Sequence, residues 1–137
     1  MSMSDHGQWL AYARSDLAAA KALLANPEHY PRQVCYLAQQ AVEKALKAAL
    51  IREQIDFPFS HDLDRLRNLL PETWRVKVAF PDLAEMTIWA IEARYPADMP
   101  EVFHIDAIRA VRTAEELSRL VEEDMGGSPG ISADDLS

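Results

Sequence analysis

The feature that most constrains the fold is a long, unbroken helical pattern in the first half of the chain. The run AQQAVEKALKAAL, residues 38–50, is rich in residues that favour helices, and no glycine or proline interrupts it. It belongs to a longer segment, residues 31–54, whose leading proline is accepted in the first turn of a helix. Apolar residues recur there at steps of three or four: Val34, Leu37, Ala41, Ala45 and Ala48. Because further apolar residues flank this stripe, we expect a central helix that packs against two or three neighbours.

Several other segments carry helical periodicity, and none shows a convincing run of strand alternation. The other predicted helices are residues 8–25, a short helix capped by Ser60 and ended by Pro71, a helix from about Pro81 to Tyr95, and a last helix that begins between Glu101 and Asp106. Prolines mark several of these ends, because proline disfavours helix in the residue before it. Four long helices and a short one, joined by short connections, predict an all-α, up-and-down bundle.

Length and composition predict one globular domain. The chain has 137 residues, of which 49% are hydrophobic and 26% charged. We expect residues 1–7 to be a flexible N-terminus, residues 8–125 the helical domain, and residues 126–137 a disordered tail with little to bury. No apolar run is long enough to span a bilayer, and the first residues lack the features of a signal peptide. We therefore expect a cytoplasmic protein without membrane association.

Charge and residue spacing argue against several kinds of site. The net charge of −8 opposes broad electrostatic attraction to nucleic acid. The single cysteine, Cys35, has no partner for an internal disulfide and is interpreted as a core residue. The histidines lie without the paired spacing of metal ligands: His6, His29, His61 and His104. We expect no metal site and no cofactor.

Polar residues gather on the predicted central helix and form the first candidate site. Glu43 and Lys47 are four residues apart, in the order that favours pairing along a helix surface. Gln40, Lys44 and Lys47 also stack on one side, where they would present amide and ammonium donors to an anion. Two interpretations are open at this point: a solvated face of an ordinary helix, or one wall of a ligand site.

Two later motifs supply further candidates. In SHDL, residues 60–63, the Ser-His-Asp sequence is no catalytic triad, because neighbouring side chains on a helix diverge by about 100°. His61 on its own is interpreted as a surface residue of the first turn. In ARYP, residues 93–96, Arg94 complements the C-terminal end of the helix dipole. An arginine beside a tyrosine, here Tyr95, is also a common way to hold a phosphate and stack a base.

In their order along the chain, these stretches resemble the HEPN domain family (higher eukaryotes and prokaryotes nucleotide-binding). The matching stretches are ARSDLAAAKALL, CYLAQQAVEKALKAAL, FSHDLDRLRNLL and ARYP, within about residues 9–125. The resemblance implies a bundle of four long helices plus a short one, often paired as a homodimer. It also implies a nucleotidyltransferase-like partner, in many family members as a toxin–antitoxin pair.

Some members of this family are ribonucleases that depend on an arginine followed, after four to six residues, by a histidine. This sequence departs from that pattern. Arg52 precedes His61 with eight residues between them, and Arg94 precedes His104 with nine. Because the motif is absent, an RNA-cleaving toxin is the disfavoured alternative. We assign no catalytic residue, expect no intrinsic catalysis, and disfavour RNA as a ligand.

The resemblance implies a function for the polar residues. It aligns these ligand-binding candidates with the family's motifs: Gln40, Glu43, Lys44, Lys47, His61, Arg94 and Tyr95. The function it implies is a nucleotide- or anion-binding accessory module that partners a nucleotidyltransferase-like protein in a toxin–antitoxin-type pair. A second possibility is a structural polar network that fixes helix register. A third is an antitoxin-like or scaffold protein, with Trp74, Trp89 and Phe103 as candidate contacts.

Overall fold

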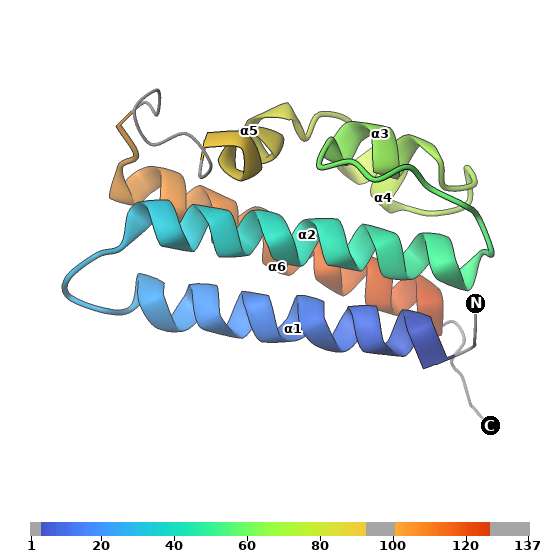
Figure 1. Ribbon diagram of the computed structural model, residues 1–137, viewed down its shortest axis with the longest axis horizontal. Helices are drawn as coiled ribbons and strands as arrows, with labels where there is room; N and C mark the ends of the chain where they lie inside the picture. The colour runs from blue at the N-terminus through green and yellow to red at the C-terminus, as the bar shows by residue number, and fades with distance from the viewer. Residues whose placement is uncertain (1–3, 93–100, 127–137) are drawn as a thin grey trace.

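The computed structural model describes residues 4–92 and 101–126, and every regular element in these two ranges is a helix. The elements are α1 (Ser4–Leu24), α2 (Pro31–Arg52), α3 (Leu63–Asn68), α4 (Val76–Ala79), α5 (Ala84–Glu92) and α6 (His104–Gly126). Figure 1 shows α1, α2 and α6 as long rods, with α3, α4 and α5 on the side of α2 away from α1. The predicted all-α bundle is confirmed.

The helix boundaries agree with the sequence pattern in some places and extend it in others. α1 begins at Ser4, earlier than the periodicity predicted, and α6 begins at His104, within the predicted window. The short helix α4 is an addition, in the stretch after Trp74 where no periodic pattern is present. The predicted end of the fourth helix at Pro96, and the tail from residue 127 onward, lie outside the described residues.

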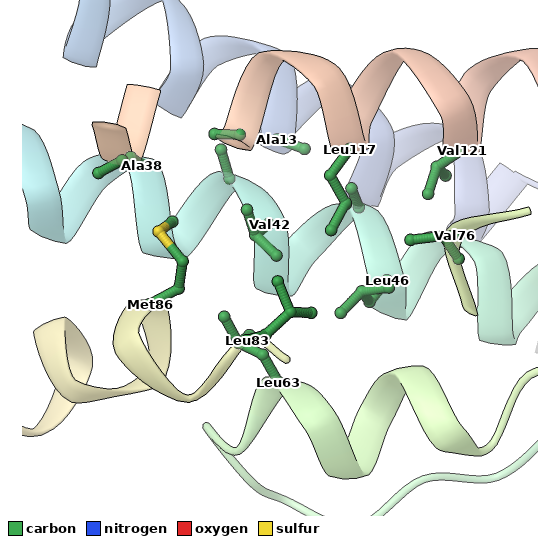
Figure 2. Packing of buried hydrophobic residues seen from close by; sticks show 14 of the residues in the cluster. Ala13, Ala38, Val42, Leu46, Leu63, Val76, Leu83, Met86, Leu117 and Val121 are labelled. Atoms are coloured by element: carbon green, nitrogen blue, oxygen red, sulfur yellow. The ribbon is translucent and has the colours of Figure 1, made fainter. Parts of the chain in front are cut away.

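α2 is the central helix, as its wide apolar stripe predicted. It contacts α1, α3, α5 and α6, and most of its residues from position 38 to position 51 are buried. Figure 2 shows Val42 and Leu46 of α2 between Leu63 and Leu83 on one side and Leu117 on the other. Small buried residues, among them Ala13 of α1, allow the helix axes to approach closely.

The C-terminal end of α2 turns the chain back over the helix. The N–H of Gln54 donates to the Ile51 carbonyl and the N–H of Ile55 to the Leu50 carbonyl, each at 2.9 Å. This is the Schellman arrangement, and it requires the left-handed conformation that Gln54 adopts, with φ of 60°. Residues 55–62 follow this reversal and return alongside α2. The turn therefore decides where the SHDL motif lies.

The N-cap of α3 differs from the prediction. Ser60 was expected to cap the helix, but the cap is Asp62, whose Oδ1 accepts from the N–H of Arg65 at 3.2 Å. Asp62 directly precedes Leu63, the first helical residue, so its short carboxylate reaches the exposed N–H of the third position. The Ser60 hydroxyl accepts instead from the Asp62 N–H at 3.0 Å. Ser60 therefore orders the turn that leads into the helix.

Two polar contacts hold α3 against α5. The Leu63 N–H donates to Oγ1 of Thr87 at 3.1 Å, and the Leu83 N–H donates to Oδ1 of Asp64 at 2.8 Å. Both satisfy backbone groups at the start of a helix, where no intrahelical partner exists. They fix the beginning of α3, and with it the segment that carries His61.

Candidate functional site

A buried carboxylate on α2, Glu43, is the centre of a hydrogen-bonded cluster. Its Oε1 accepts from Nε2 of Gln39 at 3.0 Å and from Nδ1 of His61 at 2.8 Å. Its Oε2 accepts from Nζ of Lys47 at 2.8 Å, and Oε1 of Gln39 accepts from Nε2 of Gln40 at 2.7 Å. We call these five residues the Glu43 network. Gln39, Glu43 and Lys47 are four residues apart and therefore share one helix face.

Two opposing effects set the charge of Glu43. The residue is only 4% exposed, and burial alone would raise the pKa of its carboxyl group. Hydrogen bonds from Lys47, His61 and Gln39 favour the ionised form and outweigh burial, so the pKa lies below its ordinary value. An ionised carboxylate has no hydrogen to donate. His61 must therefore carry a proton on Nδ1 and donate it to Glu43.

The ammonium group of Lys47 is enclosed by Glu43 and three aromatic rings. Its Nζ lies 5.4 Å from the ring centroid of Trp9, 5.7 Å from that of Phe57 and 5.9 Å from that of Phe59. A cation within about 6 Å of an aromatic ring is attracted to the face of that ring. The Lys47 side chain is buried, and the equally buried carboxylate of Glu43 balances its charge. Lys47 joins the start of α1 to α2 and to the loop after α2.

The other candidate residues divide into two groups. Nζ of Lys44 donates to Oδ2 of Asp16 on α1 at 2.6 Å, in a pair that is partly exposed. Lys44 is thus tied to α1, whereas Gln40, Glu43, Lys47 and His61 are brought together in the Glu43 network. Arg94 and Tyr95 lie outside the described residues. That these two residues lie beside the other candidates stays a prediction.

The network reaches the surface at the segment before α3. His61 is 28% exposed at its side chain, and the Phe59 ring packs edge-on against it with centroids 5.7 Å apart. Phe59 is 89% exposed, a large value for a phenylalanine. Gln40, at the other end of the network, is half-buried. An aromatic ring and an imidazole are therefore presented side by side above a balanced buried ion pair.

Several residues of this region were missed in the sequence. Gln39 was not among the predicted ligand residues, although it lies one turn before Glu43 on the same face. Phe57 and Phe59 flank Pro58 directly before the SHDL motif. Two aromatic residues next to a candidate motif were the signal that could have found them. Trp9 and Asp16 carried no local signal, because their partners lie on another helix.

Those members of the two long arginine–histidine pairs that the structure describes are engaged in other contacts. Nη1 of Arg52 donates to the backbone oxygen of Met125 at 2.6 Å, whereas His61 is bound to Glu43. The ring of His104 packs against that of His29, with centroids 4.5 Å apart. Arg94, its predicted companion, lies outside the described residues. Arg52 and His61 therefore serve different parts of the fold.

Cys35 is a core residue, as predicted. Burial raises the pKa of its thiol to about 12, with smaller contributions from the negative charges of Asp106 and Glu85. The group is therefore a neutral thiol at physiological pH and a poor nucleophile.

Other kinds of site are not found in the parts of the chain that the structure describes. Within residues 4–92 and 101–126, no three His, Cys, Asp or Glu side chains are arranged to hold a metal ion. No helix in those ranges combines the length and the apolar character that crossing a membrane requires. Surface hollows lie away from the Glu43 network: one between α1 and α6, and smaller ones beside Tyr36 and Trp74.

Comparison with protein families identifies the class to which this bundle belongs. The model of the HEPN domain matches residues 6–124, which is most of the chain. The chain therefore belongs to the HEPN domain family, and the resemblance seen in the sequence is confirmed. A search of curated proteins finds no match.

Two solved structures share the fold. The protein TT1696 from Thermus thermophilus is 26% identical, with a TM-score of 0.77 over 88% of this chain and 98% of its own. ST0689, an archaeal HEPN homologue, is 22% identical, with a TM-score of 0.65 over 88% of this chain and 97% of its own. The likeness to ST0689 concerns the fold alone. In both comparisons nearly the whole of the other protein is matched.

Proposed function

We propose that this HEPN-domain protein is an accessory module that binds a nucleotide or another anionic ligand and catalyses no reaction itself. The ligand would lie at the exposed edge of the Glu43 network, beside His61 and Phe59. The observation that carries this proposal is the pairing of an oriented imidazole with a highly exposed aromatic ring, 5.7 Å apart.

The chemistry of this edge suits an anion with a planar group. Nδ1 of His61 donates to Glu43, and the carboxylate would stabilise the protonated imidazolium form, whose Nε2–H can donate to a phosphate. Lys47 balances Glu43, so a bound anion would not face an uncompensated carboxylate. The exposed face of Phe59 is suited to stacking on a base.

Lys44 would supply a second cation. Its ammonium pairs with Asp16, and the two side chains are 25% and 20% exposed. A phosphate group that reached Lys44 through this exposed part would share the ammonium with Asp16. Arg94 and Tyr95 complete the predicted ligand set, with the arginine on phosphate and the tyrosine on the base.

A partner protein is the second half of the proposal. Membership of the HEPN family supports a nucleotidyltransferase-like partner in a toxin–antitoxin-type pair, and a homodimeric state. Co-purification from the native host tests it. Recovery of a nucleotidyltransferase-like protein is the expected result, and its repeated absence from the purified complex would contradict the pairing.

Calorimetric titration with ATP and other nucleotides tests the ligand site. We expect measurable binding that His61→Ala and Phe59→Ala weaken about tenfold each, since a stacked base contributes roughly 1–3 kcal/mol. The matched control is Phe103→Ala, an exposed aromatic before α6. Absence of heat at millimolar ligand, with and without the partner, would remove the proposal.

A scaffold function is the alternative that one observation favours. The Glu43 network satisfies its own buried groups, which is what a purely structural network does. Of the aromatic contacts suggested for a scaffold, Trp74 is buried and donates to Glu53, Trp89 is half-buried, and Phe103 is exposed. A protein partner that co-purifies while nucleotides fail to bind would establish this function instead.

A further inference from the structure

A hollow at one end of the bundle lies between the last turns of α1 and the first turns of α2. The connection from α1 to α2 places these two helix ends side by side (Figure 1). The hollow is lined by Leu23 of α1 and by four residues of α2: Arg32, Gln33, Tyr36 and Leu37. Its volume is about 420 Å³. Sites for small molecules occupy about 300–1,000 Å³, so the hollow is large enough for a small ligand.

Much of the lining is apolar. Leu23 and Leu37 are partly buried, and both pack against the hydrophobic core. The side chain of Tyr36 is 38% exposed, so part of its ring faces water. Covering this surface with the apolar body of a ligand would remove it from water, which is favourable.

The polar side chains of the lining are free to bind a ligand. Within residues 4–92 and 101–126, the guanidinium of Arg32, the amide of Gln33 and the hydroxyl of Tyr36 form no hydrogen bond or ion pair. All three side chains are exposed. Arg32 and Tyr36 are four residues apart and therefore share one face of the helix. The hollow thus presents a cation and two further donors next to apolar surface.

The charge of this lining differs from that of the other two hollows described above. Carboxylates line both of them, among them Glu116 between α1 and α6, and Glu53 and Asp124 beside Trp74. The described lining beside Tyr36 contains an arginine and no carboxylate. In a chain with a net charge of −8, this hollow is a place where the local charge is positive.

We propose that this hollow binds a small organic monocarboxylate with an aliphatic or aromatic body. The planar guanidinium of Arg32 matches a carboxylate, to which it can donate two parallel hydrogen bonds. Gln33 and Tyr36 would donate to the same group, while Leu23 and Leu37 would contact the apolar body. A nucleotide suits the hollow less well, because its ribose and its several phosphate charges would meet an apolar lining with one cation.

This site is separate from the Glu43 network. Tyr36 lies one helical turn before Gln40, and the lining of the hollow shares no residue with the network. The two sites also take different ligands. A failure of monocarboxylate binding would therefore leave the proposed nucleotide site untouched, and the two outcomes are distinguishable.

Titration with octanoate and with octanol tests the site, because the two probes carry the same alkyl chain and only octanoate has a charge. Amide NMR spectra of the whole chain report both the affinity and the place of binding. We expect octanoate to shift the amide resonances of Leu23, Gln33 and Leu37 along one saturation curve. Octanol should bind about tenfold more weakly, because it cannot form charge-assisted hydrogen bonds with Arg32.

Two variants separate the charge from the apolar contact. Arg32→Ala should weaken octanoate binding about tenfold and leave octanol binding unchanged. Tyr36→Ala should weaken the binding of both probes, because it removes ring surface that either alkyl chain would cover. The matched control is Arg65→Ala, which removes an exposed arginine of α3 and should change neither affinity. Circular dichroism checks that each variant keeps its helices.

Several results would overturn the proposal. One is the lack of a saturable shift at millimolar octanoate, and another is octanol that binds as tightly as octanoate. Shifts confined to residues outside the hollow would also contradict it. So would Arg32→Ala or Tyr36→Ala variants that bind octanoate like wild type.

Discussion

At the scale of single residues, Glu43 and Lys47 illustrate how a buried ion pair depends on all of its partners. Each side chain is almost wholly enclosed, and each would carry a large desolvation penalty alone. Lys47 has the carboxylate and three aromatic rings, while Glu43 has Lys47, His61 and Gln39. The pair is therefore stable as a set, and removal of one member leaves the others unsatisfied.

Breaking the pair should cost more than replacing it. We expect Glu43→Gln to destabilise the protein by about 3–5 kcal/mol, because it leaves the Lys47 ammonium buried without a counter-charge. The combined substitution Glu43→Leu with Lys47→Met should cost much less than the sum of the single substitutions, since apolar side chains need no partner. Urea unfolding measures wild type, Glu43→Gln, Glu43→Leu, Lys47→Met and the combined variant. Additive effects would contradict the coupling.

The lowered pKa of Glu43 predicts acid sensitivity. A carboxyl group whose pKa is lower in the folded state contributes stability at neutral pH and loses it as the pH falls. The loss of stability should begin when the pH falls to about the ordinary glutamate pKa of 4.5. It should continue until the pH is below the lower pKa that Glu43 has in the folded protein. Urea midpoints across this range should therefore fall more steeply for wild type than for Glu43→Gln. Glu28→Gln, at an exposed position, should follow wild type.

At the scale of elements, the connection from α2 to α3 determines the site. The Schellman turn at the end of α2 reverses the chain, and the Asp62 cap starts α3 at a fixed place. His61 lies in the segment between these two signals, which returns along α2. Its ring therefore reaches Glu43, in the middle of that helix. The candidate site depends on how two helices end and begin, as well as on which residues they carry.

The two capping candidates of α3 should differ in their effect. We expect Asp62→Ala to destabilise the protein by about 1 kcal/mol, because the Arg65 N–H loses its acceptor at the helix N-terminus. Ser60→Ala should cost less, since its hydroxyl orders a solvent-accessible turn. Thermal unfolding of both variants measures the difference. A larger loss for Ser60→Ala would contradict the assignment of the cap.

At the scale of the whole molecule, the domain is organised around α2. This helix contacts α1, α3, α5 and α6, so its buried side chains form a core that these helices share. A protein with one shared core of this size unfolds as a single cooperative unit. The chain reversal before α2 brings α1 alongside it, and α6 packs against both (Figure 1).

Truncation of a central side chain should therefore weaken the whole domain. We expect Leu46→Ala to destabilise it by about 2–5 kcal/mol, because the residue is fully buried among several helices. Leu69→Ala, at a partly exposed position, should cost about 1 kcal/mol or less. Helical content and tryptophan fluorescence, followed together in urea, should change in one transition for both variants. Separate transitions would contradict a single shared core.

Much of the fold was predictable, but the site was predictable only in part. The apolar stripe of α2 predicted its central position, because burial on several sides needs a wide apolar face. The choice of Ser60 as the cap of α3 was wrong, because a cap depends on where the first helical turn starts, and that shifted by two residues. Gln39 was not among the predicted site residues, because an amide within an alanine-rich run gives no sign of being buried.

The sequence by itself determined which segments are helical and where most of them stop, because periodicity, capping residues and prolines act within a few residues of chain. It also determined the family. Only the tertiary structure decided that Glu43 bonds His61, that Lys44 bonds Asp16 and that Lys47 lies among three rings. These contacts join residues far apart along the chain, and their geometry depends on the direction of each turn and the packing of whole helices.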